Sequence, residues 1–242
     1  MRCSAFVLFL LTLTVQQAIA APVESFGDIK LWSGSGANQA ALAIDFDGAS
    51  STDQALVWGY RWDGDKTVED MLRSVVANDP RLFTNLGSTF GQFGRSLFGI
   101  GYDNNGNGTF SISNPNTDFG SDGIAFSTSG TPGIVANESG DLYFEGFTFG
   151  FFELSESFSD PFGVGQYIPA SVGISGVVSA TETDFLSDGQ TAGLTWNDTS
   201  AGFVGGKRPE NFVAALAIPE PSSFALLCFA GAAFACRRRG KL

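Results

Sequence analysis

The chain has 242 residues, carries 25 Asp and Glu against 13 Lys and Arg for a net charge of −12, and contains no histidine. An acidic surface repels phosphate backbones, so we expect no nucleic-acid partner. Without histidine the chain cannot build a Ser-His-Asp triad or the usual zinc sites, and carboxylate chemistry is the route to catalysis that stays open. The cysteines Cys3, Cys228 and Cys236 lie in the terminal segments, so the body has no disulfide framework and no thiolate metal site.

Residues 1–20 are predicted to be a secretory signal peptide. Arg2 precedes an apolar run of about 11 residues, which is short of the ~20 needed to span a bilayer. The run is followed by Ala18 and Ala20, small residues in the spacing that a signal peptidase reads. We therefore expect cleavage after Ala20.

Residues 21–217 are predicted to form a β-rich extracellular body. Short apolar stretches alternate with clusters of Gly, Asn, Asp and Ser, which is typical of strands joined by turns. In 40–46, Leu42, Ile44 and Phe46 alternate on one face of a strand. The expected fold class is a β-rich α+β body with a mostly antiparallel sheet or sandwich and one amphipathic helix. The predicted strands are Asp28–Trp32, Ala40–Phe46, Ala55–Arg61, Ser96–Tyr102, Gly108–Ile112, Gly123–Ser127, Asp141–Glu153, Val172–Val178 and Phe212–Ala217.

The strand around WGYRW is a candidate ligand site. Trp58, Tyr60 and Trp62 fall at alternate positions and therefore on one side of the strand. Such rings could stack on sugars, with Asp63 and Asp65 accepting hydroxyl hydrogen bonds. Large aromatic residues at alternate positions also fill protein cores. The sequence leaves both interpretations open.

One segment has helical periodicity. In DKTVEDMLRSVVANDP, Thr67 and Asp70 form a capping-box pair at the start, and Pro80 predicts the end. A single amphipathic helix among strands has to bury its apolar face on a sheet. That face consists of Val68, Met71, Leu72, Val75 and Val76.

The segment YDNNGNGTF resembles the first half of a calcium loop. Asp103, Asn105 and Asn107 have the D-x-[DN]-x-[DN]-G spacing, but Asn114 stands where a bidentate Glu is needed. An Asn-Gly turn joining two strands explains the same residues without a metal. Calcium is thus one possible ligand, and no other cofactor is expected.

The C-terminal segment 218–242 has three parts in a fixed order. Pro219, Glu220 and Pro221 are followed by the 13-residue apolar run 224–236 and then by Arg237, Arg238 and Arg239. As a hydrophobic helix the run would measure about 20 Å against about 30 Å of hydrocarbon. The arginines would stay cytoplasmic by the positive-inside rule. We interpret the segment as a transient inner-membrane stop; a permanent tail anchor is the alternative.

This order of parts resembles the PEP-CTERM sorting tail of Gram-negative bacterial surface proteins. The resemblance implies that exosortase, a membrane protease, recognises Pro219-Glu220-Pro221 and removes the tail, and that the protein reaches the cell surface or an exopolysaccharide matrix. The two prolines hold the motif extended, as a protease requires. The body segment VWGYRWDGDKTVEDMLRSVVANDPRLF, with LFGIGYD after it, is similar to a domain seen on other proteins with this tail, for which no activity is implied.

The expected function is therefore structural or adhesive, at the surface or within exopolysaccharide, after transient membrane insertion. A carbohydrate- or calcium-binding module is the alternative. We do not expect an enzyme, because the acids stand in no recognisable catalytic pattern. A cleft with two carboxyl groups about 5–10 Å apart would make glycoside hydrolysis a candidate function again.

Overall fold

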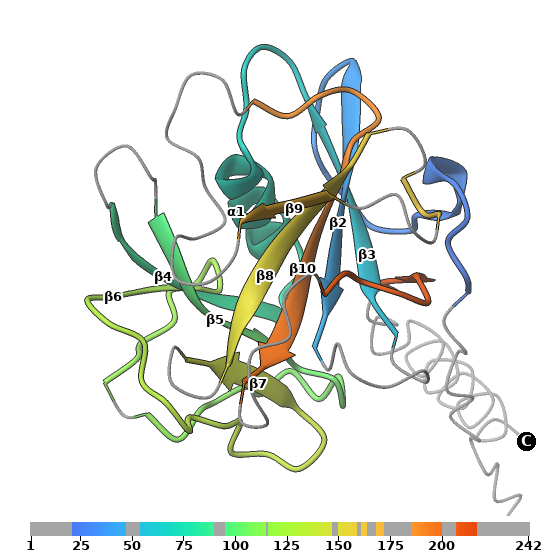
Figure 1. Ribbon diagram of the computed structural model, residues 1–242. Coiled ribbons are helices and arrows are strands. Elements are labelled where there is room, and N and C mark those ends of the chain that lie inside the picture. The colour runs from blue at the N-terminus through green and yellow to red at the C-terminus, as the bar shows by residue number, and fades with distance from the viewer. Residues whose placement is uncertain are drawn as a thin grey trace, which may run out of the picture.

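The computed structural model describes residues 21–46, 54–89, 95–114, 116–146, 150–158, 161–163, 168–171, 185–199 and 207–216. Within them it contains two sheets, one α-helix and a short 3-10 turn, Phe26–Asp28. Figure 1 shows the two sheets with helix α1 beside them. No helix in this described part is both long and apolar enough to cross a membrane. The predicted signal peptide, the strand Val172–Val178 and the sorting tail lie outside the described residues.

The larger sheet has the strand order β1-β3-β2-β10-β8-β9, with β11 also paired to β3. Its central strand, β10, runs parallel to β2 and antiparallel to β8. The sheet is therefore mixed: the predicted β-rich body with one helix is confirmed, but parallel pairs accompany the expected antiparallel ones. The strands are β1 (Trp32–Gly34), β2 (Asn38–Asp45), β3 (Leu56–Trp62), β8 (Gly150–Ser157), β9 (Ile168–Ser171), β10 (Thr191–Asp198) and β11 (Val213–Ala214).

The smaller sheet has the order β6-β4-β5-β7. Strand β4 pairs antiparallel with β5 and parallel with β6, so this sheet is mixed too. Figure 1 places it beside the larger sheet, with α1 near both. Its strands are β4 (Leu82–Thr89), β5 (Arg95–Tyr102), β6 (Ile124–Ser127) and β7 (Leu142–Glu145).

Helix α1 spans Val68–Asn78 and confirms the predicted boundaries. Thr67 accepts a hydrogen bond from the Asp70 amide, and Asp70 reaches back to the Thr67 amide, so the capping box is present. Asp79 follows the helix directly before Pro80, which prevents the helix from continuing. All five predicted apolar positions of the helix are buried.

One hydrophobic core joins α1 to both sheets. From the larger sheet it takes the predicted face of Leu42, Ile44 and Phe46, and from the smaller sheet Leu86 and Ile100. Because an alternating strand buries its apolar side chains on one face, the pattern in 40–46 was readable from sequence. A second cluster on the opposite face of the larger sheet contains Ala41, Val57, Val23 and Ala214.

Several predicted strands are wrong. Residues 108–112 form no strand and make only one bridge, Ile112 to Ala136. The predicted strand Asp28–Trp32 is replaced by the 3-10 turn and β1. The predicted strand Asp141–Glu153 is divided into β7 and β8, which belong to different sheets. Strands β4, β9 and β10 were not predicted. In β4 (LFTNLGST) and β10 (TAGLTWND), Thr and Asn lie among the apolar residues and weaken the apolar signal.

Candidate functional site

The proposed sugar platform lies inside the core. Trp58, Tyr60 and Trp62 share one face of β3, as predicted, but they are only 2, 5 and 3% exposed. The rings of Tyr60 and Trp62 stack with centroids 5.6 Å apart. Their faces are covered by protein, so the interpretation of Trp58, Tyr60 and Trp62 as a ligand platform is corrected to core packing.

The glycine between these aromatic residues has a packing role. The Trp32 ring crosses the other face of β3 so closely that a Cβ on Gly59 would lie 2.4 Å from it. The Arg61 guanidinium covers the same indole, 4.7 Å from its centroid. In WGYRW the three aromatic residues therefore face α1, while Gly59 leaves room for Trp32 on the opposite face.

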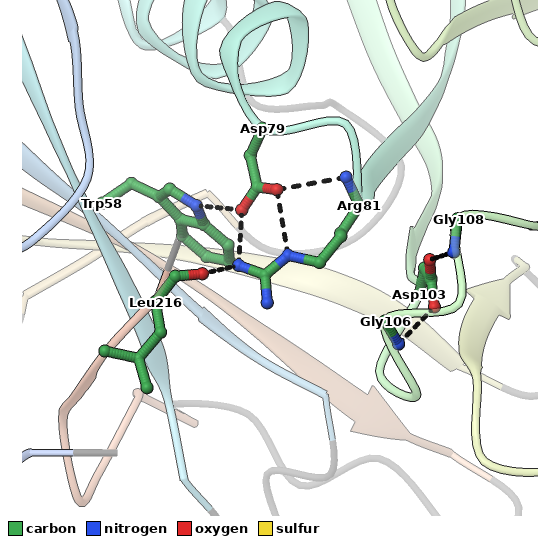
Figure 2. A network of polar contacts seen from close by, with 7 residues as sticks. All are labelled: Trp58, Asp79, Arg81, Asp103, Gly106, Gly108 and Leu216. Atoms are coloured by element: carbon green, nitrogen blue, oxygen red, sulfur yellow. Dashed lines mark hydrogen bonds and ion pairs between the residues drawn. The ribbon is translucent and has the colours of Figure 1, made fainter. Parts of the chain in front are cut away.

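The predicted calcium loop is closed by its own backbone. The Asp103 carboxylate accepts hydrogen bonds from the amides of Gly106 at 2.7 Å and Gly108 at 2.9 Å, as Figure 2 shows. Asp103 is 1% exposed, whereas Asn105 and Asn107 are exposed. The expected hairpin is wrong, because β5 pairs with β4 and β7 and not with 109–112.

A second loop adds acidic groups beside the first. Glu138 accepts hydrogen bonds from the side chains of Asn107, at 2.6 Å, and Thr109, at 2.5 Å. These bonds, from Thr109 first, lower the pKa of Glu138. Burial raises the pKa of Asp141, and the nearby charges of Asp103 and Glu138 raise it further.

The oxygen atoms of these two loops are of the kind that calcium prefers. However, no group of three or more acidic, Cys or His side chains in the described part of the chain is arranged to hold a metal ion. Asp103, Asn105 and Asn107 thus lie in one loop, as predicted, and Asp103 is engaged with backbone amides.

Two acidic residues of the larger sheet are buried close to one another. Asp45 and Glu153 flank Thr195 in register, from β2 and β8, and both are buried. Glu153 accepts from the side chain of Asn197 at 3.1 Å and from the amide of Lys207 at 3.2 Å. A cavity of about 300 Å³ opens between the sheets, and Asp45 is its one acidic lining residue among those described. The described lining of the cavity thus offers one carboxyl group, while Asp45 and Glu153 lie on strands that are separated by β10.

Sequence reasoning missed a polar network at the end of α1. The buried Asp79 carboxylate accepts from the Trp58 indole at 2.9 Å, and from the amide and guanidinium of Arg81 at 3.1 to 3.2 Å. The guanidinium also lies 4.9 Å from the centroid of the Tyr102 ring. Figure 2 shows the hydrogen bonds of Asp79 with Trp58 and Arg81. The sequence Asp79-Pro80-Arg81 contains the ion pair, but the fold alone brings Trp58 and Tyr102 to it.

The same arginine binds the end of the body. The Arg81 guanidinium donates to the backbone carbonyl of Leu216, visible in Figure 2 as the contact between the two residues. Just before Leu216, the amide of Ala215 donates to Val57 of β3 at 3.1 Å. The described body therefore ends as a chain segment fixed to both β3 and Arg81.

The segment after Leu216 is where comparison with known proteins finds a match. A family model described as the PEP-CTERM protein-sorting motif matches residues 217–239. The chain is a PEP-CTERM domain-containing protein. The matched residues include the predicted motif Pro219-Glu220-Pro221 and the cluster Arg237–Arg239. A PEP-CTERM motif implies processing by exosortase, a membrane protein, and export to the cell envelope or surface.

The PEP-CTERM match covers the tail and not the body. Searches of curated proteins and of solved structures find no match for the chain. The likeness of the body to a domain on other PEP-CTERM proteins stays a prediction. The sorting residues Pro219, Glu220, Pro221, Arg237, Arg238 and Arg239, and the cleavage residues Ala18 and Ala20, lie outside the described residues.

Proposed function

We propose that the body of this PEP-CTERM protein is a non-catalytic structural or adhesive component of the cell surface, held within or upon exopolysaccharide. The observation that carries the proposal is that the sorting motif begins at residue 217, directly after the β-rich body described up to Leu216. The delivered part is therefore this body, whose Trp58, Tyr60 and Trp62 stabilise the core.

The chemistry of the body supports a passive role. Large aromatic residues in a core contribute stability, and an acidic surface favours solubility outside the cell. Between Ser96 and Gly206 the sequence has no Lys or Arg. A protein with this surface remains dispersed among other anionic components and needs no cofactor to do so.

The test is made in the native bacterium. The protein is followed by intact mass in inner-membrane, surface and washed-matrix fractions, in the parent strain and in strains lacking exosortase or the exopolysaccharide. We expect a tail-free form at the surface of the parent, an uncut form without exosortase, and loss from the matrix fraction without polysaccharide. Attachment of cells should also fall when the gene is deleted. Unchanged attachment, together with release of the protein into the medium, would contradict the structural role.

Calcium binding is the second candidate, and one observation favours it. The Oδ2 atom of Asp141 is buried and has no hydrogen-bond partner among the described residues, and the charges of Asp103 and Glu138 lie close by. A divalent cation would offset this repulsion. Calorimetric titration with calcium tests this candidate, with Asp103→Ala as the control. An equally weak binding heat from the wild type and the variant would rule out calcium binding.

A further inference from the structure

The last residues of the body are held on two sides. The amide of Val213 donates to Ala55 at 2.9 Å, and β11 pairs with β3, the strand between β1 and β2. On the other side, the amide of Ala214 donates to Ala21 at 2.9 Å. Ala215 is fully buried. Leu216 is the last residue that the structure describes before the sorting motif, and its carbonyl accepts the bond from Arg81.

Arg81 is well fixed for this contact. Its side chain is 12% exposed, and two of its guanidinium nitrogens donate to the Asp79 carboxylate at 3.2 Å. The ring of Tyr102 lies beside the guanidinium. A guanidinium carries five N–H donors in a rigid plane, and the terminal nitrogen Nη2 that donates to Asp79 also donates to the Leu216 carbonyl. We name Arg81, Asp79 and the Leu216 carbonyl the tail clamp.

The clamp lies very near the sorting motif. Only Ala217 and Ile218 separate Leu216 from Pro219, so the α-carbons of Leu216 and Pro219 are at most about 11 Å apart even in a fully extended chain. A protease that reads an extended peptide binds backbone on both sides of its recognition residues. Residues up to Leu216 would then enter its cleft, yet the Leu216 carbonyl is already bound by Arg81.

We propose that Arg81 is a positioning residue for removal of the sorting tail. By holding Leu216 on the body, Arg81 slows the processing of the tail. The clamp and the protease compete for the same backbone, and the clamp must open before the motif is fully bound. The proposal rests on the removal of the tail by exosortase. The wild-type chain tests that removal separately in the same experiment.

The test follows tail loss by pulse labelling in the exosortase-bearing host, using the full chain. Arg81→Gln removes the charged donor, and we expect tail loss to be about tenfold faster, because a hydrogen bond to a charged group shifts an opening equilibrium by at least that factor. Trp58→Phe is the matched control. It removes the 2.9 Å bond to Asp79 and leaves the contact with Leu216 in place.

The control separates positioning from stability. Both variants weaken the Asp79 network, so both should lower the melting temperature, but Arg81→Gln alone should accelerate processing. Equal acceleration by both would assign the effect to general loosening of the body and overturn the proposal. An unchanged or slower rate for Arg81→Gln would also overturn it.

An insertion provides a test that keeps Arg81. Four Gly and Ser residues placed between Ala217 and Ile218 should accelerate processing with the clamp intact, since the protease no longer needs Leu216. In that longer chain, Arg81→Gln should add nothing further. An insertion without effect would contradict the proposal even if Arg81→Gln failed to fold. A wild-type chain that kept its tail would contradict the sorting assignment instead.

Discussion

The amide of Ala214 donates a hydrogen bond to the carbonyl of Ala21 at 2.9 Å. Ala21 is the first residue after the predicted signal cleavage, and Ala214 lies three residues before the matched sorting motif begins at residue 217. The residue that follows the predicted signal cleavage and a residue just before the sorting motif therefore lie side by side on the body. The contact continues with the amide of Val23, which donates to Phe212 at 2.9 Å.

Removing residues 21–23 should destabilise the body. Val23 is buried against Phe212 and Ala214, and the deletion also removes two backbone hydrogen bonds. We expect the free energy of unfolding to fall by about 2–4 kcal/mol, measured in urea. Glu24→Ala, at an exposed position, is the control and should change little. A deletion as stable as the intact body would show that this pairing does not contribute.

The capping box of α1 gives a second prediction. Thr67→Ala removes the acceptor for the Asp70 amide, which is now bonded at 3.2 Å. The free energy of unfolding should fall by about 1 kcal/mol. Thr67→Ser keeps the hydroxyl and should retain most of the stability. Equal losses for Ala and Ser would mean that the Thr67 methyl group, and not the cap, matters.

Two buried tyrosines predict instability in alkali. Burial raises the pKa of Tyr102 and of Tyr143 well above the ordinary value, and the neighbouring Glu145 raises that of Tyr143 further. Above about pH 10 the unfolded chain loses phenolic protons that the folded chain keeps. Stability should therefore be unaffected below that pH and fall by up to about 2.7 kcal/mol per pH unit above it.

The alkaline prediction has a direct control. Tyr102→Phe removes one titrating group, so its stability should fall with about half the slope above pH 10. Ultraviolet absorbance should show phenolate forming in the same pH range as unfolding. Parallel slopes for the variant and the wild type would remove Tyr102 from the explanation.

The raised pKa of Asp141 predicts that replacing this residue will stabilise the fold in a pH-dependent way. Burial and two nearby acids raise its pKa, so its charge destabilises the fold when it is ionised. Asp141→Asn should raise the melting temperature at neutral pH. The gain should disappear as the pH falls through the folded pKa of Asp141, because the wild-type carboxyl is then neutral as well.

Calcium allows the same group to be tested without changing pH. If the two loops bind the ion, millimolar calcium should raise the melting temperature of the wild type and have less effect on Asp141→Asn, because the ligand stabilises only the folded state that binds it. Magnesium at the same concentration controls for ionic strength. Equal responses to the two salts would count against a calcium site.

The sequence by itself determined the features that depend on near neighbours in the chain. Thr67 and Asp70 are three residues apart, so the cap of α1 needed no tertiary information. The alternation of Leu42, Ile44 and Phe46 likewise identified the buried face of β2. The sorting motif was readable because Pro219-Glu220-Pro221, an apolar run and an arginine cluster follow one another directly.

The tertiary structure alone decided which groups meet across the chain. Trp58 and Trp62 have the same alternation whether they face a ligand or a helix, and only the position of α1 made them core residues. Asp103 looked like a metal ligand until the loop turned the amides of Gly106 and Gly108 onto it. Arg81 and Leu216 are 135 residues apart. No local pattern encodes such a contact, because it depends on where β3, α1 and the chain end are placed by burial of the shared core.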